Sequence, residues 1–153
     1  MIHSTVKVET GLNKPPVPQV RKALEGYPTY DRTTINSWED VEFRKVVEEA
    51  GRRKLIMTAW RTEACLTFPA LDALAEGYEV YVPVDAVGGT SLAAHDAALR
   101  RIVQAGARLI SVPPLFCELQ RDWKRSDAVA AFVNLFIWTG GTDGLRFAAD
   151  KAE

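Results

Sequence analysis

The sequence has little net charge and no long apolar run, and each shortage excludes a class of protein. Nineteen Lys and Arg oppose twenty Asp and Glu, which gives a net charge of -1 and no overall positive field to attract a nucleic-acid backbone. No apolar stretch approaches the roughly 20 residues that span a bilayer, and the N-terminus lacks the apolar core of a secretory signal. These absences predict a cytoplasmic protein that binds neither nucleic acid nor membrane.

Cysteine and histidine are also scarce, with two residues of each. Two thiols do not make a disulfide framework, and no CxxC pair or Cys/His cluster supplies the ligands of a zinc site. His3 and His95 are too far apart in sequence to indicate a metal. We therefore predict no metal and no cofactor, and we interpret Cys117 as a packed thiol.

The 153 residues, 47% hydrophobic and 25% charged, suit a single globular domain over residues 1–153. Ser37 is predicted to cap a helix that runs to Gly51, and Ser91 a helix that runs from Leu92 to Gln104. Further helices are expected over 65–76 and over 115–138, the latter broken near Ser126, with a weakly structured tail after Trp138. Strands are expected over 3–9, 55–59, 78–86 and 109–112, the last ended by the prolines at 113 and 114.

Strands that alternate with helices predict an α/β fold, with a mainly parallel sheet and helices on both faces in a Rossmann-like three-layer arrangement. Ligands of such folds bind beyond the carboxyl ends of the strands. Cys65 follows one of those ends, in the first turn of a predicted helix that Thr62 is placed to cap. Free amides and the positive helix end favour a thiolate there, and Pro69 makes the turn irregular. From position alone, a buried core cysteine is the favoured interpretation, because free cysteine is among the most buried residue types.

The run from Lys54 to Gly89, KLIMTAWRTEACLTFPALDALAEGYEVYVPVDAVGG, resembles the nucleophile segment of the isochorismatase-like cysteine hydrolases. RTTINSWEDVEF at 32–43, QAGARL at 104–109 and CELQRDW at 117–123 resemble an uncharacterised oligomeric subgroup of that superfamily. The resemblance implies that Cys65 is the nucleophile of an acyl-enzyme mechanism on a small amide or related C–N substrate. It also places Arg32 where the family has a lysine, as electrostatic support that cannot act as an acid or base.

The family's catalytic aspartate has no counterpart here by motif. It stands on a strand before the one that His3 begins, so the chain is expected to be N-terminally truncated relative to the family. Asp31, Asp72, Asp85 and Asp96 are interpreted as loop, exposed helix, strand-end turn and helix surface respectively. The chain is then either an incomplete hydrolase or a natural variant that keeps the fold, unless an adjoining subunit contributes a carboxylate.

The backbone of Trp60, Arg61, Thr62 and Ala64 is the oxyanion site that the resemblance implies, with a cis peptide expected next to Thr62. The Trp60 side chain is interpreted either as a pocket wall or as packing, and so are Trp38, Phe68 and Trp123. Residues 88–91 read as an ordinary strand-to-helix turn more than as a phosphate cradle. Two hypotheses remain: a cysteine hydrolase, or a catalytically impaired homologue with an assembly or ligand-binding role. Exposed strand edges predict a homo-oligomer.

Overall fold

The computed structural model describes residues 1–139, 144 and 146. Its first part holds two strands and two short helices before the helix α2, in the order β1 (His3–Val6), α1 (Pro18–Ala23), β2 (Thr29–Arg32), the 3₁₀ turn η1 (Ser37–Glu39) and α2 (Val41–Glu49). The centre holds β3 (Lys54–Ile56), the turn η2 (Thr62–Leu66), α3 (Thr67–Ala75), β4 (Glu79–Pro83), the 3₁₀ turn η3 (Val84–Ala86), α4 (Leu92–Gln104) and β5 (Arg108–Ile110). The helices α5 (Val112–Gln120) and α6 (Ser126–Thr139) follow. The tail expected after Trp138 lies almost wholly outside the described residues.

All strand pairs are parallel, which confirms the predicted α/β class. The strands form two sheets, β1-β2 and β3-β4-β5. Leu55 lies opposite Val80, and Val82 lies opposite Leu109. The sequence pattern predicts strands and crossovers but contains no direct signal of strand order, so the division into two sheets emerges only from the structure.

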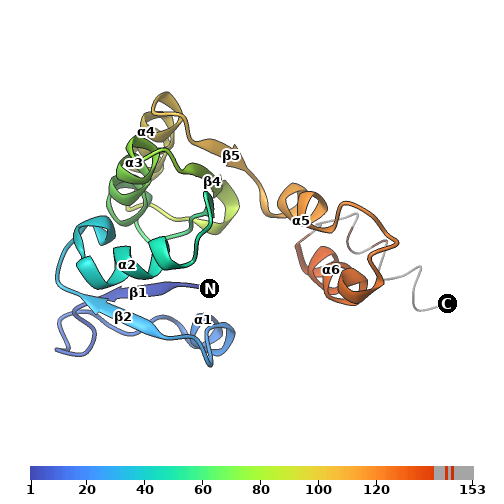
Figure 1. Ribbon diagram of the computed structural model, residues 1–153, viewed down its shortest axis with the longest axis horizontal. Coiled ribbons are helices and arrows are strands. Elements are labelled where there is room, and N and C mark those ends of the chain that lie inside the picture. Colours follow the sequence, from blue (N-terminus) through green and yellow to red (C-terminus); the bar gives the residue numbers. More distant parts are fainter. Residues whose placement is uncertain (140–143, 145, 147–153) are drawn as a thin grey trace.

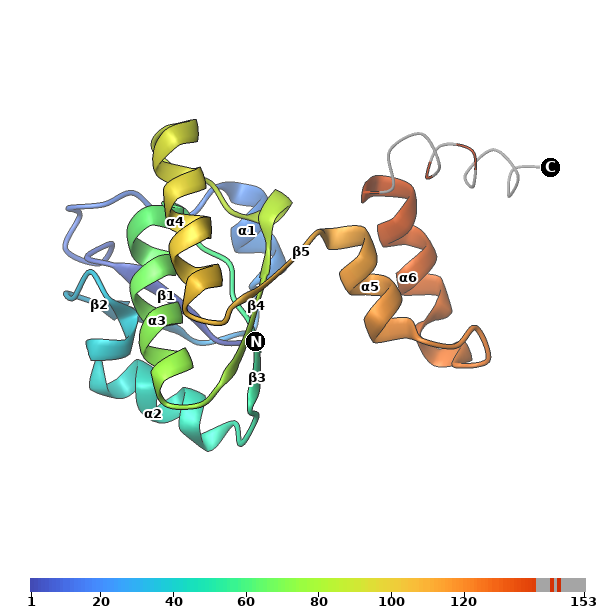
Figure 2. The ribbon, with the colours of Figure 1, turned by 90° about the horizontal axis from the view of Figure 1, so that it is seen from above.

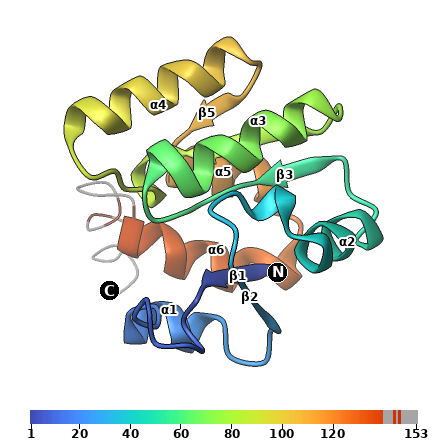
Figure 3. The ribbon, with the colours of Figure 1, turned by 90° about the vertical axis from the view of Figure 1, so that its left-hand side faces the viewer.

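The main core lies between β4 and the helices α3 and α4. Val80 and Val82 alternate along β4 and meet Ala70 of α3 and Ile102 of α4, all at most 1% exposed. Figure 3 shows α3 and α4 side by side over the sheet, with β1, β2 and α1 below them. Burial of these apolar side chains is the main favourable term that fixes the site-bearing elements in place.

Two predicted element starts differ from the structure. Asp40, not Ser37, caps α2, because its Oδ1 accepts the Phe43 amide at 2.9 Å, while Asn36 caps the separate turn at Ser37. The prolines at 113 and 114 do not end a strand but stand in the first turn of α5, where no intrahelical N–H is needed. The Ser91 cap and the bounds of α4 are confirmed, with Ser91 Oγ accepting the Ala94 amide at 3.1 Å.

The helices α5 and α6 form a hairpin that projects away from the rest of the chain (Figures 1 and 2). It follows β5 directly. At its base, the Asp85 carboxylate accepts the Val112 amide at 2.9 and 3.1 Å, so η3 holds the first turn of α5. The break predicted near Ser126 is confirmed as the boundary between the two helices.

Candidate active site around Cys65

Cys65 stands in a wide π-helical turn, η2, between β3 and α3. Pro69 has no N–H to offer the Cys65 carbonyl, so a regular α-helix cannot run unbroken through this point. The Thr67 amide and hydroxyl both donate to the Thr62 carbonyl, the hydroxyl at 2.6 Å, and this closes the wider turn. The irregular helix start expected from Pro69 is confirmed.

The residues before Cys65 are tied to the connection that follows β4. Beyond the ends of β3 and β4, Trp60 and Gly88 form an isolated parallel bridge, and the amides of Arg61 and Thr62 donate to the Gly88 carbonyl at 2.6 and 2.8 Å. Both segments leave the carboxyl ends of neighbouring parallel strands. Cys65 therefore lies at the sheet edge where this class of fold binds ligands.

The expected cis peptide next to Thr62 was wrong: the described residues contain none. The chain instead turns at Arg61, whose φ of 71° lies in the left-handed region. The two amide bonds to Gly88 hold Arg61 in this conformation. The predicted helix cap at Thr62 was also wrong, because the Thr62 hydroxyl hydrogen-bonds to His95 instead.

Thr62 and Glu63 contact His95 and Thr90, to which the sequence analysis gave no role in the site. The fully buried Thr62 places Oγ1 2.9 Å from His95 Nδ1, in a hydrogen bond to α4. Glu63 Oε1 accepts the Thr90 amide at 3.1 Å. His95 is thus a structural partner of the Cys65 turn. The only sequence signal for it is its place one turn after Ser91, at the start of the helix that faces the site.

The Glu63 carboxylate is held in its charged form by hydrogen bonds. Donation from Thr90 and from the Glu63 amide itself lowers the pKa of this carboxyl below its ordinary value, with a smaller contribution from the Arg61 charge. Its second oxygen, Oε2, is buried beside Gly89 and has no hydrogen-bond partner among the described residues. The carboxylate therefore fastens the turn before Cys65 to the turn before α4.

The Cys65 side chain itself is half-buried, and so is Ala64. A half-buried residue is not sealed in the core, and the hydrolase hypothesis requires such an accessible sulfur. The neighbouring Trp60 is 82% exposed and rests against Gly88, where an added Cβ would come within 3.4 Å of its ring. Trp60 thus presents an aromatic surface beside the turn.

Arg32 lies at the end of β2 and is only 5% exposed. Its guanidinium donates to neutral oxygens: Nε to Ser4 Oγ at 3.2 Å and Nη1 to the carbonyls of Thr34 and, at 2.7 Å, Ile35. None of the ion pairs among the described residues includes it. Within the described residues, no hydrogen bond joins Arg32 to the Cys65 turn. The loop that follows Arg32 does reach α3, where Asn36 Nδ2 donates to Asp72 Oδ2 at 2.6 Å.

The four aspartates weighed as replacements for the family's acid have other roles. Asp31 lies in β2 rather than in a loop, and its carboxylate accepts Thr5 Oγ1 at 2.6 Å and the amides of Val8 and Glu9. These bonds, that of Thr5 first, lower the pKa of Asp31 below its ordinary value. Asp85 accepts the Val112 amide, and Asp72 accepts the Asn36 side chain. The interpretation of Asp72 as a residue on an exposed helix face was therefore wrong. Asp96 is exposed on α4, as predicted.

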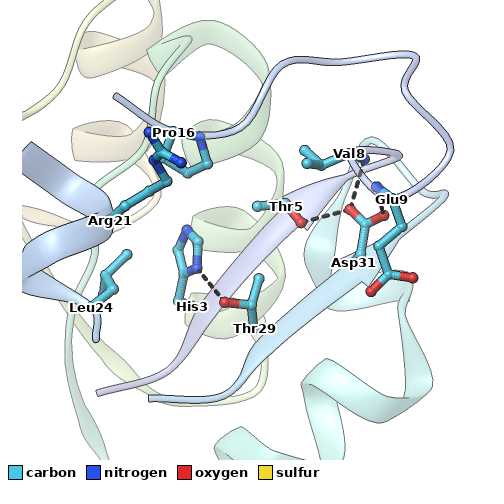
Figure 4. Close-up of a pocket in the computed structure, with 9 residues that line it drawn as sticks. All are labelled: His3, Thr5, Val8, Glu9, Pro16, Arg21, Leu24, Thr29 and Asp31. Atoms are coloured by element: carbon cyan, nitrogen blue, oxygen red, sulfur yellow. Dashed lines mark hydrogen bonds between the residues drawn. The ribbon is translucent and has the colours of Figure 1, made fainter. Parts of the chain in front are cut away.

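Figure 4 shows the surroundings of Asp31, a hollow of about 210 Å³ between β1, β2 and α1. His3 lies on its floor, with Nδ1 3.2 Å from Thr29 Oγ1, and partial burial lowers the pKa of this imidazole. Arg21 of α1 and Leu24, the residue that follows α1, also line it. Both carboxylate oxygens of Asp31 accept hydrogen bonds from β1 and the turn after it, so the carboxylate in this hollow has a structural role. Cys65 is not among the residues that line the hollow.

Other sequence interpretations are settled by burial. Cys117 is exposed on α5, so its interpretation as a packed thiol was wrong. Trp38 is buried against Tyr78 in an edge-on contact, and Trp123 is exposed on the hairpin, where it packs edge-on against Phe132. Among the described residues no group of three or more His, Cys, Asp or Glu is placed to hold a metal ion, and no helix there has the length and apolar content to cross a bilayer.

Comparison with known proteins identifies the family. The isochorismatase domain model matches residues 3–113, which include both strands of the first sheet, the Cys65 turn and β5. The chain therefore belongs to the isochorismatase family, as the resemblance of its Cys65 segment indicated.

Among curated proteins the chain is similar to the probable hydrolase YcaC of Escherichia coli, with 39% identity over 121 residues. That match covers 78% of this chain, and the chain spans 58% of the length of the relative. Two solved structures are also similar over 99% of this chain and 74% of theirs. YcaC from Pseudomonas aeruginosa, described with hexane-2,5-diol and covalent acrylamide, matches with a TM-score of 0.87 and 31% identity. The E. coli YcaC gene product, described as an octameric hydrolase of unknown specificity, matches with a TM-score of 0.86 and 35% identity.

Proposed function

We propose that the chain is a cysteine hydrolase that acts on a small amide or related C–N substrate through an acyl-enzyme on Cys65. The observation that carries the proposal is the placement of a half-buried thiol in an irregular turn at the carboxyl edge of parallel strands. A family of hydrolases and a relative with a covalently bound acrylamide support it. The partner that this site would take is a small-molecule substrate.

In the proposed reaction, Cys65 Sγ attacks the amide carbonyl and forms a C–S bond. The C–N bond then breaks, and the amine leaves with the proton that the thiol lost. Water hydrolyses the thioester, which releases the carboxylic acid and restores the thiol. Because Asp31, Asp72 and Asp85 are engaged in structural hydrogen bonds, we assign the proton transfer to none of them.

The negative oxygen formed during attack needs donors close to Cys65. In the resting structure the amides of Arg61 and Thr62 donate to Gly88 and that of Ala64 donates to the Arg61 carbonyl at 3.1 Å. We therefore assign the oxyanion chiefly to the amide of Cys65 itself, with Trp60, Arg61, Thr62 and Ala64 as the frame that positions it. The exposed Trp60 ring supplies an apolar wall for the substrate.

Arg32 is the proposed electrostatic support. A guanidinium that is buried without an ion-pair partner is costly, and such groups concentrate at functional sites. Its guanidinium hydrogen-bonds to carbonyl and hydroxyl dipoles, and its charge also acts on the neighbouring Asp31 carboxylate, whose oxygens are held by Thr5 and by two amides. The cation can therefore still stabilise negative charge that develops nearby. Arginine keeps this charge throughout, so it supports the reaction without exchanging protons.

Ammonia release from a panel of small primary amides tests the proposal. We expect the purified chain to release ammonia from at least one aromatic or aliphatic amide, at a rate proportional to protein concentration. No release from any amide by a folded preparation would contradict the hydrolase proposal. That result would favour the second hypothesis, a catalytically impaired homologue that keeps an assembly or ligand-binding role.

We also propose that the chain forms a homo-oligomer in a cytoplasmic setting. An octameric relative of 35% identity supports self-association. Exposed strand edges are the source of association expected from the sequence, and the α5–α6 hairpin adds exposed apolar side chains as a second source.

A further inference from the structure

The α6 helix is apolar, yet eight of its 14 residues are exposed. Of its 14 residues only Phe132 is buried, and Asp127 is the only charged residue. A helix that faces water normally carries charged residues along its outer side. Here the outer side carries Ala130, Ala131, Asn134, Leu135 and Trp138, which are exposed and recur every three or four residues.

The large side chains on the hairpin add to this uncovered surface. Trp138 is 82% exposed and Trp123 is 60% exposed, which together leaves on the order of 300 Å² of aromatic surface in water. Leu119 of α5 and Leu135 of α6 are also exposed. A stable interface buries about 800 Å² on each partner, and single monomers rarely leave patches of more than a few hundred Å² uncovered. The two indoles alone therefore approach the patch size at which an interaction surface is expected.

We propose that this hairpin surface is covered by a second copy of the same chain. The inference rests on the self-association proposed above and names its surface. A bilayer does not fit, since α6 has 14 residues and about 20 are needed to span one. The structural match to the octameric relative covers 99% of this chain, so the hairpin belongs to the part shared with a protein that assembles with itself.

The base of the hairpin is fixed, which a recognition surface requires. Asp85 caps the first turn of α5, and Arg125 Nη1 donates to the Leu119 carbonyl at 2.7 Å, which ties the α5–α6 connection to the end of α5. Phe132 packs against Trp123 and stacks on Phe136 inside the hairpin. Each hairpin is thus built as one unit that meets its partner with the outer side of α6. A twofold arrangement would bring the same stripe to both sides of the contact.

Sedimentation velocity of the full chain and of Trp138→Glu tests this surface. We expect the wild type to sediment as an oligomer at micromolar concentration. The variant should dissociate with a dissociation constant raised at least about 30-fold, since a central indole is replaced by a charge. Leu12→Glu is the control, because Leu12 is a similarly exposed apolar residue in the turn after β1, outside the hairpin, and its substitution should leave the oligomer intact.

Hydrogen exchange of residues 126–139 provides a second measurement that does not depend on a variant. In the wild type we expect protection of this segment to rise with protein concentration. A wild type that is monomeric at every concentration would overturn self-association itself. An oligomer that is unchanged in Trp138→Glu, with exchange of α6 independent of concentration, would overturn only the hairpin surface. Both readouts are independent of hydrolysis, and Cys65→Ser should assemble like the wild type.

Discussion

Replacement of Cys65 by serine is expected to lower the rate of amide hydrolysis by at least about 10³-fold. A hydroxyl is a far poorer nucleophile than a thiol unless a base activates it, and no described residue hydrogen-bonds to the position of Sγ as such a base would. The substitution is nearly isosteric at a half-buried position, so thermal unfolding should change little. The measurement is ammonia release at saturating amide, with the melting temperature as the check on folding.

Cys117→Ser is the matched control for this experiment. Cys117 is exposed on α5, outside the proposed site, so its rate should stay within about twofold of the wild type. Equal activity in Cys65→Ser and the wild type, or loss of activity in Cys117→Ser alone, would contradict the assignment of the nucleophile.

Replacement of Gly89 by alanine is expected to damage both stability and activity. A Cβ at Gly89 would lie 2.9 Å from His95 Cβ and 3.0 Å from Glu63 Oε2. Neither atom moves freely, because His95 is fixed to α4 and to Thr62, and Glu63 is fixed to Thr90. We expect a loss of about 1–3 kcal/mol in the free energy of unfolding. Displacement of the Cys65 turn should lower kcat/KM by about 10- to 100-fold. Urea unfolding and steady-state kinetics measure the two effects.

Gly88→Ala is the neighbouring control. A Cβ at Gly88 would meet only the Trp60 ring at 3.4 Å, and that side chain is exposed and can shift. The variant should keep its stability to within about 1 kcal/mol. Similar losses at both glycines would show that the connection after β4 tolerates no substitution at all. The specific contact of Gly89 with His95 and Glu63 would then not explain the effect.

The parts of the fold written in local patterns could be predicted from the sequence. Ser91 with the periodic residues after it defines α4, and the missing N–H of Pro69 predicts the irregular turn at Cys65. Cap assignment at Ser37 and Asp40 is harder, because two good capping residues stand three positions apart. In the structure Asn36 accepts the Trp38 amide and Asp40 accepts the Phe43 amide, so the helix begins after Asp40.

The contacts that complete the site join residues distant in sequence and leave no local signal. The place of His95 one turn after Ser91 puts it at the start of α4, but does not indicate that its ring reaches Thr62, 33 residues earlier. Likewise the Glu63 carboxylate finds Thr90 only because β3 and β4 pair in parallel and send their following turns to one edge. Cys117 is exposed on a hairpin that projects from the sheet. The periodicity of α5 does not predict how the hairpin is oriented, so it could not predict this exposure.

Mass spectrometry of the chain, mixed with a hydrolysable amide and quenched in acid within seconds, tests the covalent role of Cys65 most directly. The account predicts a mass increase equal to the acyl group of that amide, located by peptide mapping on Cys65 and missing from Cys65→Ser. Steady ammonia release with no adduct on Cys65, or an adduct on Cys117 alone, would contradict it.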